Sequence, residues 1–137
     1  DADIICTTTA VIEPILFSRQ VADGTHLNLV GSSRAGPSEV DTALVARVRL
    51  FADHREGVLA QGAEFLKAKA EGLVDDAHVL GEIGEVMAGT LRGRLTAADV
   101  TAYKSLGSVV QDIACAWRLY QDARDGGAAF GAQVVEL

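Results

Sequence analysis

The sequence predicts an α/β domain with about three parallel strands, followed by helices that include a long C-terminal one. Short apolar runs rich in β-branched residues alternate with helix-like stretches, and this alternation favours a parallel sheet with right-handed crossovers. The 137 residues, 49% hydrophobic and 23% charged, suffice for one globular domain and are few for two. We therefore expect one domain over residues 1–125, with residues 126–137 as a tail.

Three apolar runs are predicted to form the strands, at residues 4–6, 26–30 and 48–53. Short continuous apolar runs are typical of strands buried on both faces of a parallel sheet. Three threonines close the first run, and Gly31 ends the second. Because ligands bind at the carboxyl ends of parallel strands, the polar loop 31–38 is the stretch where we expect a site.

Four helices are expected, at about residues 39–47, 55–70, 81–88 and 96–124. Ser38 is the predicted N-cap of the first helix. Gly72 and Gly89 are predicted to end the second and third helices. The spacing of Thr96 and Asp99 is that of a capping box at the start of the fourth. Apolar residues recur every three or four positions along this last helix, which indicates packing in the core or at a subunit interface.

The composition argues against several classes of partner. A net charge of −7 without a cluster of Lys or Arg argues against nucleic acid, whose binding depends on a basic surface. No apolar run approaches the roughly 18–20 residues that span a bilayer, so no membrane partner is expected. Cys6 and Cys115 lack CxxC spacing, which favours buried thiols in a reducing, cytoplasmic setting over a disulfide. The three histidines lack metal-ligand spacing, so no metal is expected.

Two short motifs admit both a functional and a structural interpretation. Gly31 and Gly36 have the spacing of a phosphate-binding P-loop, but Pro37 stands where that motif needs lysine, which excludes this interpretation. Glu82 and Glu85 could be paired acids, although acidic residues in a first helical turn also offset the helix dipole, and we favour that structural role.

A polar pair, Lys104 and Ser105, interrupts the apolar stripe of the predicted last helix beside Gly107. Such a pair can mark the close approach of a ligand or of another backbone. It can equally be a solvated face beside a tight helix contact, and the residues alone leave both open. The sequence contains no G-x-G-x-x-G fingerprint of a dinucleotide-binding turn.

Several segments together resemble the ornithine cyclodeaminase/mu-crystallin family, over residues 1 to about 123. In chain order the segments are 2–9, 24–31, 39–41, 81–86, 104–107 and 111–114. Each is weak alone, but their order and spacing are specific. The resemblance implies the C-terminal portion of a Rossmann-type dinucleotide-binding domain that uses NAD or NADP.

Family members are about twice as long as this chain. The resemblance implies that an N-terminal substrate and dimerisation region, together with the glycine-rich first strands, lies upstream. We expect the whole protein to be a homodimer. We expect the chain alone to be inactive, because the phosphate-binding turn and the catalytic group would lie in the upstream part.

The family motifs imply roles for eight residues of this sequence. The residues expected to bind the cofactor are Thr8, Thr9, Ala10, Val30 and Ser105, the last of these from the final helix. The residues expected to contact the substrate are Ser33, Leu106 and Gly107. The resemblance thus shifts the segment 104–107 toward a functional role, and no residue of this chain is assigned as catalytic.

Ser33 stands where ornithine cyclodeaminases and related alanine dehydrogenases carry an aspartate. A serine hydroxyl cannot replace that carboxylate as an unaided base. The resemblance therefore favours the mu-crystallin and cyclic imine reductase branch, in which NAD(P)H donates a hydride to an α-imino acid. The expected substrate is a small cyclic imino acid such as pyrroline- or piperideine-carboxylate. Ornithine cyclodeaminase, which makes proline and ammonia, and a non-catalytic NAD(P)-binding crystallin-like protein remain the alternatives.

Overall fold

The computed structural model describes residues 2–126 and contains a five-stranded, all-parallel sheet with the strand order β1-β2-β5-β3-β4. The strands are β1 Ile4–Thr7, β2 His26–Leu29, β3 Arg49–Ala52, β4 Val79–Glu82 and β5 Thr101–Lys104. The helices are α1 Thr42–Arg47, α2 Arg55–Gln61, α3 Ala63–Ala70, α4 Ile83–Met87 and α5 Val109–Gly126, with short 3₁₀ helices η1 Ser18–Gln20 and η2 Asp76–His78. The chain divides into two units, one up to residue 107 and one from residue 108 onward.

The strand ends are aligned across the sheet. Thr7 pairs with Leu29, Leu29 with Lys104, and Lys104 with Ala52, so that β1, β2, β5 and β3 end in one row. Because all strands are parallel, the four loops that follow them leave from the same edge of the sheet. This alignment positions the candidate site.

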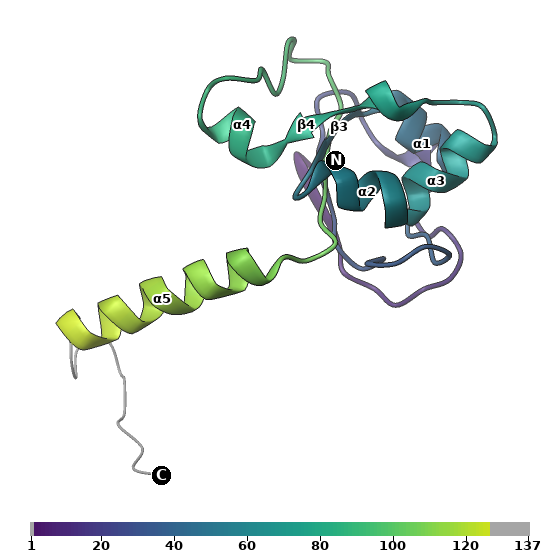
Figure 1. Ribbon diagram of the computed structural model, residues 1–137. Helices are drawn as coiled ribbons and strands as arrows, with labels where there is room; N and C mark the ends of the chain where they lie inside the picture. The colour runs from purple at the N-terminus through teal and green to yellow at the C-terminus, as the bar shows by residue number, and fades with distance from the viewer. Residues whose placement is uncertain (1, 127–137) are drawn as a thin grey trace. The chain divides into compact units, whose positions relative to one another are not determined.

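One face of the sheet carries the hydrophobic core. The helices α1, α2 and α3 lie together on one side of the strands, and α4 lies on the other (Figure 1). Side chains of β2, β3 and β5 pack against the three helices, among them the fully buried Leu27, Ala52 and Ala102, together with Leu44 and Val58 of the helices. Alternate residues of a strand point to one face, so this face is set by the apolar positions of the strands.

The prediction of a helix from residue 96 is wrong in its first half. Thr101–Lys104 is the central strand β5, and Gly107 after it has a φ of +88°, at which a helix cannot continue. The side chains of Thr96 and Asp99 form a turn instead of a helix cap, with the Thr96 hydroxyl donating to the Asp99 carboxylate at 2.6 Å. A short apolar run fits either a strand or a helix. Here the segment forms a strand because it pairs with β2 on one side and β3 on the other.

The other expected helices also change in extent. Residues 79–82 form strand β4, which leaves only five residues for α4. The stretch 55–70 breaks into α2 and α3 at Gly62, where a Cβ atom would lie 2.7 Å from the Val58 carbonyl oxygen. The first helix begins at Thr42 with Asp41 as its N-cap, so the expectation for Ser38 is wrong.

Other expectations concern helix ends, burial and the tail. Gly72 and Gly89 have positive φ angles just beyond α3 and α4, as predicted for residues that end helices.

Cys6 and Cys115 are free thiols, as expected, but both are exposed rather than buried. Strand β1 is not buried on both faces, since Ile4 is 63% exposed in the described chain. Of the expected tail, residues 127–137 lie outside the described residues.

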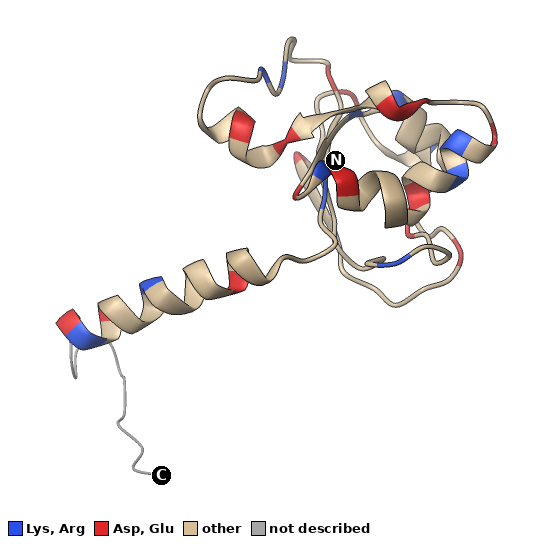
Figure 2. Ribbon diagram, viewed as in Figure 1, with Lys and Arg blue, Asp and Glu red and all other residues tan. Residues whose placement is uncertain are grey.

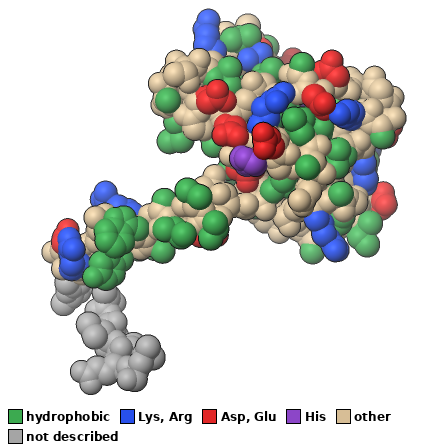
Figure 3. All heavy atoms as spheres, viewed as in Figure 1, with side chains coloured by type: hydrophobic (Ala, Val, Ile, Leu, Met, Phe, Trp, Pro, Cys, Tyr) green, Lys and Arg blue, Asp and Glu red, His purple; other side chains and the backbone are tan. Residues whose placement is uncertain are grey.

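Helix α5 taken by itself is amphipathic. Val109, Ile113, Trp117 and Tyr120 recur at spacings of three and four residues, and all are exposed in the structure. Hydrophobic side chains are visible on the surface of this helix (Figure 3). The rings of Trp117 and Tyr120 stack with centroids 5.5 Å apart. Within residues 2–126, no helix has the length and apolar character needed to cross a membrane.

Replacement of Asp41 by alanine should destabilise the domain. Its carboxylate accepts hydrogen bonds from the backbone amides of Leu44 (3.0 Å) and Ser18 (2.9 Å), so it both caps α1 and anchors the start of η1. We expect Asp41→Ala to lower the free energy of unfolding by about 1–2 kcal/mol, measured by urea denaturation. The control is Asp23→Ala, which removes an exposed ion pair with Arg47 and should cost at most about 0.5 kcal/mol. Equal losses in the two variants would contradict the assignment of the cap.

Candidate functional site

The candidate site is the edge of the sheet where β1, β2, β3 and β5 end. All eight residues predicted to bind cofactor or substrate lie in the loops that leave this edge. Exposed in this group are Thr8, Ala10, Val30, Ser33 and Gly107, and half-buried are Thr9, Ser105 and Leu106. Ser105 follows directly after β5 and does not lie in a helix, which corrects the expectation that it projects from the last helix.

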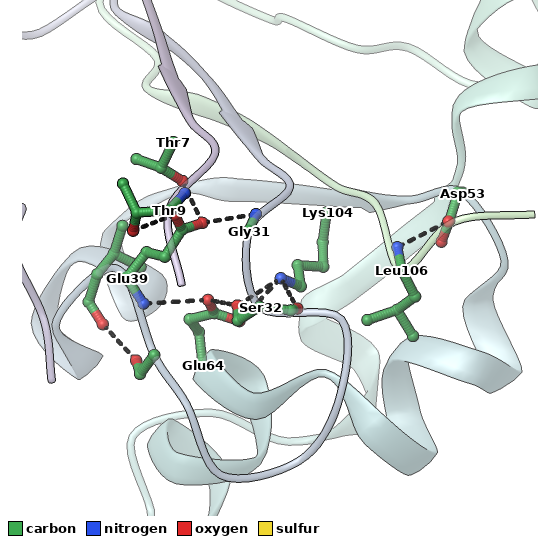
Figure 4. A network of polar contacts seen from close by, with 11 residues as sticks. Thr7, Thr9, Gly31, Ser32, Glu39, Asp53, Glu64, Lys104 and Leu106 are labelled. Carbon is green, nitrogen blue, oxygen red and sulfur yellow. Dashed lines mark hydrogen bonds and ion pairs between the residues drawn. The ribbon is translucent and has the colours of Figure 1, made fainter. Parts of the chain in front are cut away.

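Beneath these loops lies the carboxylate of Glu39, which is fully buried. It accepts hydrogen bonds from the Thr7 hydroxyl (2.7 Å), from the amide (2.6 Å) and hydroxyl (2.8 Å) of Thr9, and from the amide of Gly31 (2.8 Å) (Figure 4). Four donors thus converge on one side chain. Glu39 thereby joins the loop after β1 to the loop after β2.

The charge of Glu39 is stabilised by its donors. Burial acts to raise the pKa of this carboxyl, but the hydrogen bonds from Thr7, Thr9 and Gly31 outweigh burial and hold the pKa below its ordinary value. The side chain is therefore ionised at neutral pH. Its oxygen atoms already accept hydrogen bonds from the two loops, so we do not assign it as a base that acts on a substrate.

Gly31 allows the two loops to approach closely. A Cβ atom at this position would lie 2.2 Å from the Thr9 carbonyl oxygen and 2.3 Å from Oε1 of Glu39. Both distances are far below any real contact of a side-chain carbon, so only glycine fits. Gly31, which follows β2, is thus required because the loop after β1 passes so close to it.

A second buried cluster lies beside Glu39 and contains Lys104, Ser32 and Glu64, each 2% exposed. The Lys104 ammonium donates to the carbonyl and hydroxyl oxygens of Ser32, the latter at 2.8 Å, and lies 3.2 Å from Oε2 of Glu64 (Figure 4). The Ser32 hydroxyl donates to Oε1 of Glu64. Lys104 is therefore not part of a solvated face, which was one of the two interpretations of its sequence context.

Asp53 organises the loop after β5. Its Oδ2 atom accepts hydrogen bonds from the backbone amides of Leu106 (2.8 Å) and Gly107 (2.9 Å) and from the hydroxyl of Ser105 (3.3 Å). The residue itself comes directly after β3. One carboxylate therefore holds all three predicted ligand residues of this loop, through the backbone of Leu106 and Gly107 and through the hydroxyl of Ser105.

Sequence reasoning missed Glu39, Glu64 and Asp53. A signal was present for the two glutamates, because each adjoins apolar residues that the fold buries, Val40 in one case and Phe65 in the other. A charged side chain next to core residues is expected to be paired if it is buried. Apart from Gly31, which lies 8 residues from Glu39, their partners lie 25 to 40 residues away along the chain and could not be identified.

The acids at 82 and 85 have the structural role that we favoured. Glu82 is the N-cap of α4, and its backbone amide donates to the Glu85 carboxylate at 2.8 Å. The Glu82 carboxylate accepts a hydrogen bond from the amide of Arg55 at 2.9 Å. Both carboxylates therefore accept hydrogen bonds from backbone amides at helix starts, Glu85 at α4 and Glu82 at α2.

The charge distribution offers no basic tract among the described residues. Lys and Arg lie interspersed with Asp and Glu over the helices and loops (Figure 2). At the candidate edge, Glu39 and Asp53 are occupied by backbone and hydroxyl donors. What remains accessible is a set of hydroxyl groups, backbone groups and the side chain of Val30, which is 41% exposed.

A parallel sheet with polar, glycine-containing loops at the carboxyl ends of its strands defines an α/β protein of the ligand-binding, doubly wound class. The comparison with known proteins is more specific. The model of the ornithine cyclodeaminase/mu-crystallin family matches residues 1–127, and the chain belongs to this family.

Three relatives illustrate the similarity. Ketimine reductase mu-crystallin of Mus musculus is 35% identical over 125 residues, which make up 91% of this chain and 37% of that protein. The structure of Thermococcus litoralis Delta(1)-pyrroline-2-carboxylate reductase with NADH and L-proline is 31% identical with a TM-score of 0.84, covering 92% of this chain and 39% of that one. The iminosuccinate reductase of Paracoccus denitrificans, solved with NAD⁺, is 36% identical with a TM-score of 0.82, covering 99% of this chain and 40% of that one. The chain spans about two fifths of the length of these relatives.

Replacement of Glu39 by glutamine tests its role beneath the loops. The substitution would place an amide nitrogen against donors, so we expect Glu39→Gln to lower the free energy of unfolding by about 2 kcal/mol at neutral pH. The stabilisation by a carboxyl with a lowered pKa is present above the ordinary glutamate pKa of about 4.3 and is lost as the pH falls through the lowered pKa. The difference between the parent and the variant should therefore shrink on acidification.

Thermal unfolding across the acidic range measures this difference, with the exposed Glu13→Gln as the matched control. The control should follow the parent at every pH. A Glu39→Gln variant as stable as the parent at neutral pH would contradict the assignment of four donors to this carboxylate.

Proposed function

We propose that the protein to which this chain belongs is an NAD(P)H-dependent reductase of imines of small amino acids, with cyclic imino acids such as pyrroline- or piperideine-carboxylate as substrates. The observation that carries the proposal is the aligned edge of four strands, where Ser33 stands in place of an acid. Relatives that act as ketimine, pyrroline-carboxylate and iminosuccinate reductases support it.

The exposed groups of this edge fit a nicotinamide cofactor. Val30 presents an exposed apolar side chain at the end of β2, suited to the flat face of a nicotinamide ring, and the loop after β1 supplies hydroxyl and backbone groups suited to its amide. We assign Thr8, Thr9, Ala10, Val30 and Ser105 to the cofactor. The G-x-G-x-x-G turn that would hold the pyrophosphate is absent from this sequence, so tight binding requires more than these residues.

We assign substrate contacts to Ser33, Leu106 and Gly107. When bound, NAD(P)H supplies a hydride to the imine carbon; the C=N bond becomes a C–N bond, and the nitrogen takes up one proton. The Ser33 hydroxyl can donate a hydrogen bond to the imino acid, but its high pKa prevents it from acting as an unaided base. Because Glu39 and Asp53 accept hydrogen bonds from backbone groups, we assign neither as the proton donor.

A second candidate substrate is an open-chain imine of a dicarboxylic acid. The iminosuccinate reductase of Paracoccus denitrificans is 36% identical over all 137 residues, a longer alignment than the one with mouse mu-crystallin. This similarity supports testing iminosuccinate beside the cyclic imines. We further expect the whole protein to work as a cytoplasmic homodimer.

The direct test is the oxidation of NADH and NADPH by the whole protein in the presence of Delta(1)-pyrroline-2-carboxylate, Delta(1)-piperideine-2-carboxylate or iminosuccinate. We expect turnover with at least one imine. Ser33→Ala should raise the KM for the imine about tenfold, the effect of one lost hydrogen bond, and leave the KM for NAD(P)H unchanged. The control is Thr90→Ala, because that hydroxyl donates to the Glu85 carbonyl away from this edge.

Other outcomes would identify a different function. Release of ammonia from ornithine without net change of the cofactor would mark a cyclodeaminase, which the serine at position 33 disfavours. Binding of NAD(P)H without turnover of any imine would mark a binding protein. Either result would overturn the proposed reductase activity.

A further inference from the structure

The buried ion pair of Lys104 and Glu64 stands out among the charged groups of the described chain. Both side chains are 2% exposed, whereas the other ion pairs, such as Lys69 with Asp76, are at least partly exposed to solvent. The pair lies directly under the loop that carries Ser33. The function proposed above uses neither residue.

The position of Lys104 explains why its charge is buried. It is the last residue of β5 and pairs with Leu29 of β2, so the two side chains leave the same face of the sheet toward the helices. The long side chain carries the ammonium to the sheet edge, where the chain after β2 turns at Ser32. An apolar residue at this position would fill the space but would give Ser32 no donor.

The polar groups of the pair contact each other and the loop after β2. A lysine ammonium has three donor positions, and the three acceptors here are the Ser32 carbonyl oxygen, the Ser32 hydroxyl and Oε2 of Glu64. Oε1 of Glu64 accepts from the Ser32 hydroxyl and from the amide of Glu39 at 3.3 Å. Among the described residues, Oε2 has no hydrogen-bond donor besides Lys104.

Stability alone gives little reason for such an arrangement. Two charges that are removed from water lose their hydration, and an apolar pair of similar volume is often as stable or more stable. What an apolar pair cannot do is fix the orientation of a polar backbone segment. The ion pair specifies the conformation of Ser32 at both its carbonyl and its hydroxyl.

We propose that Lys104 and Glu64 are positioning residues, which hold Ser32 so that the exposed Ser33 next to it faces the imine substrate. The inference rests on the substrate contact proposed for Ser33. The pair also links two loops of the edge, since Lys104 precedes Ser105 in the loop after β5, while Ser32 and Glu39 both lie in the loop after β2. Three of its contacts with the loop after β2 are made by Ser32, so a shift of the pair acts most directly on the neighbouring Ser33.

The test uses the double variant Lys104→Met/Glu64→Met in the whole protein. The single variant Lys104→Met leaves the Glu64 charge buried without a partner and should lose much of its thermal stability. The double variant should recover a thermal midpoint close to that of the parent. It should nevertheless raise the KM for the imine about tenfold, as expected for Ser33→Ala, with the KM for NAD(P)H unchanged.

A second readout does not depend on turnover. The amides of Gly31 and Ser38 bracket the loop of Ser33 and donate to the carbonyl oxygens of Thr7 and Ile12. Their exchange should accelerate about tenfold or more in the double variant, while exchange in β2 and β5 stays as in the parent. The matched control is Lys69→Met/Asp76→Met, which removes an exposed pair and should change neither readout. Ser32→Ala, which keeps the ion pair, should accelerate the same amides more weakly and serves as the mild variant if the double variant does not fold.

The outcomes separate this proposal from the proposed function. A double variant with the parent's stability, KM for the imine and amide exchange overturns the positioning role. A Ser32→Ala variant with the parent's exchange overturns it if the double variant does not fold. Absence of imine turnover by the parent overturns the reductase assignment instead. The exchange of the Gly31 and Ser38 amides then still decides whether the pair positions the loop.

Discussion

The buried carboxylate of Glu39 is the interaction on which the candidate site depends. It receives four hydrogen bonds from residues that follow or end two neighbouring strands, and these bonds outweigh the effect of burial on its pKa. The close approach of the two loops that this requires leaves no space for a side chain at position 31. The Glu39 carboxylate holds the ends of β1 and β2 close together, and this close approach in turn requires glycine at position 31.

The same arrangement recurs along the edge. Glu64 with Lys104 fixes Ser32, and Asp53 fixes Leu106 and Gly107, so an acidic side chain supports each of these loops from below. The residues predicted to meet cofactor and substrate are left exposed or half-buried above these anchors. The buried acids provide rigidity and the exposed hydroxyls provide contacts, which is a division expected of a preorganised binding edge.

The sequence was informative where structure is local and much less so where it depends on distant partners. The strands at Ile4–Thr7, His26–Leu29 and Arg49–Ala52 could be predicted from short apolar runs, as could the edge at which they end. Strand β5 was missed because Thr101–Lys104 is short, fits a helical stripe and ends in a lysine. That lysine meets Ser32, which is 72 residues away, and no local pattern reveals such a contact. Glu39 was placed in a helix for the same reason, since its donors at Thr7 and Thr9 come from another strand.

The central claim is that cofactor and substrate meet at this one edge of the sheet. Hydrogen exchange of the whole protein, with and without NADH and the amino acid product, measures it directly. We expect protection confined within this chain to the segments 8–10, 30–33 and 105–107. Protection elsewhere in the chain, for example around residues 72–80 at the opposite ends of the strands, with these three segments unchanged, would contradict the account.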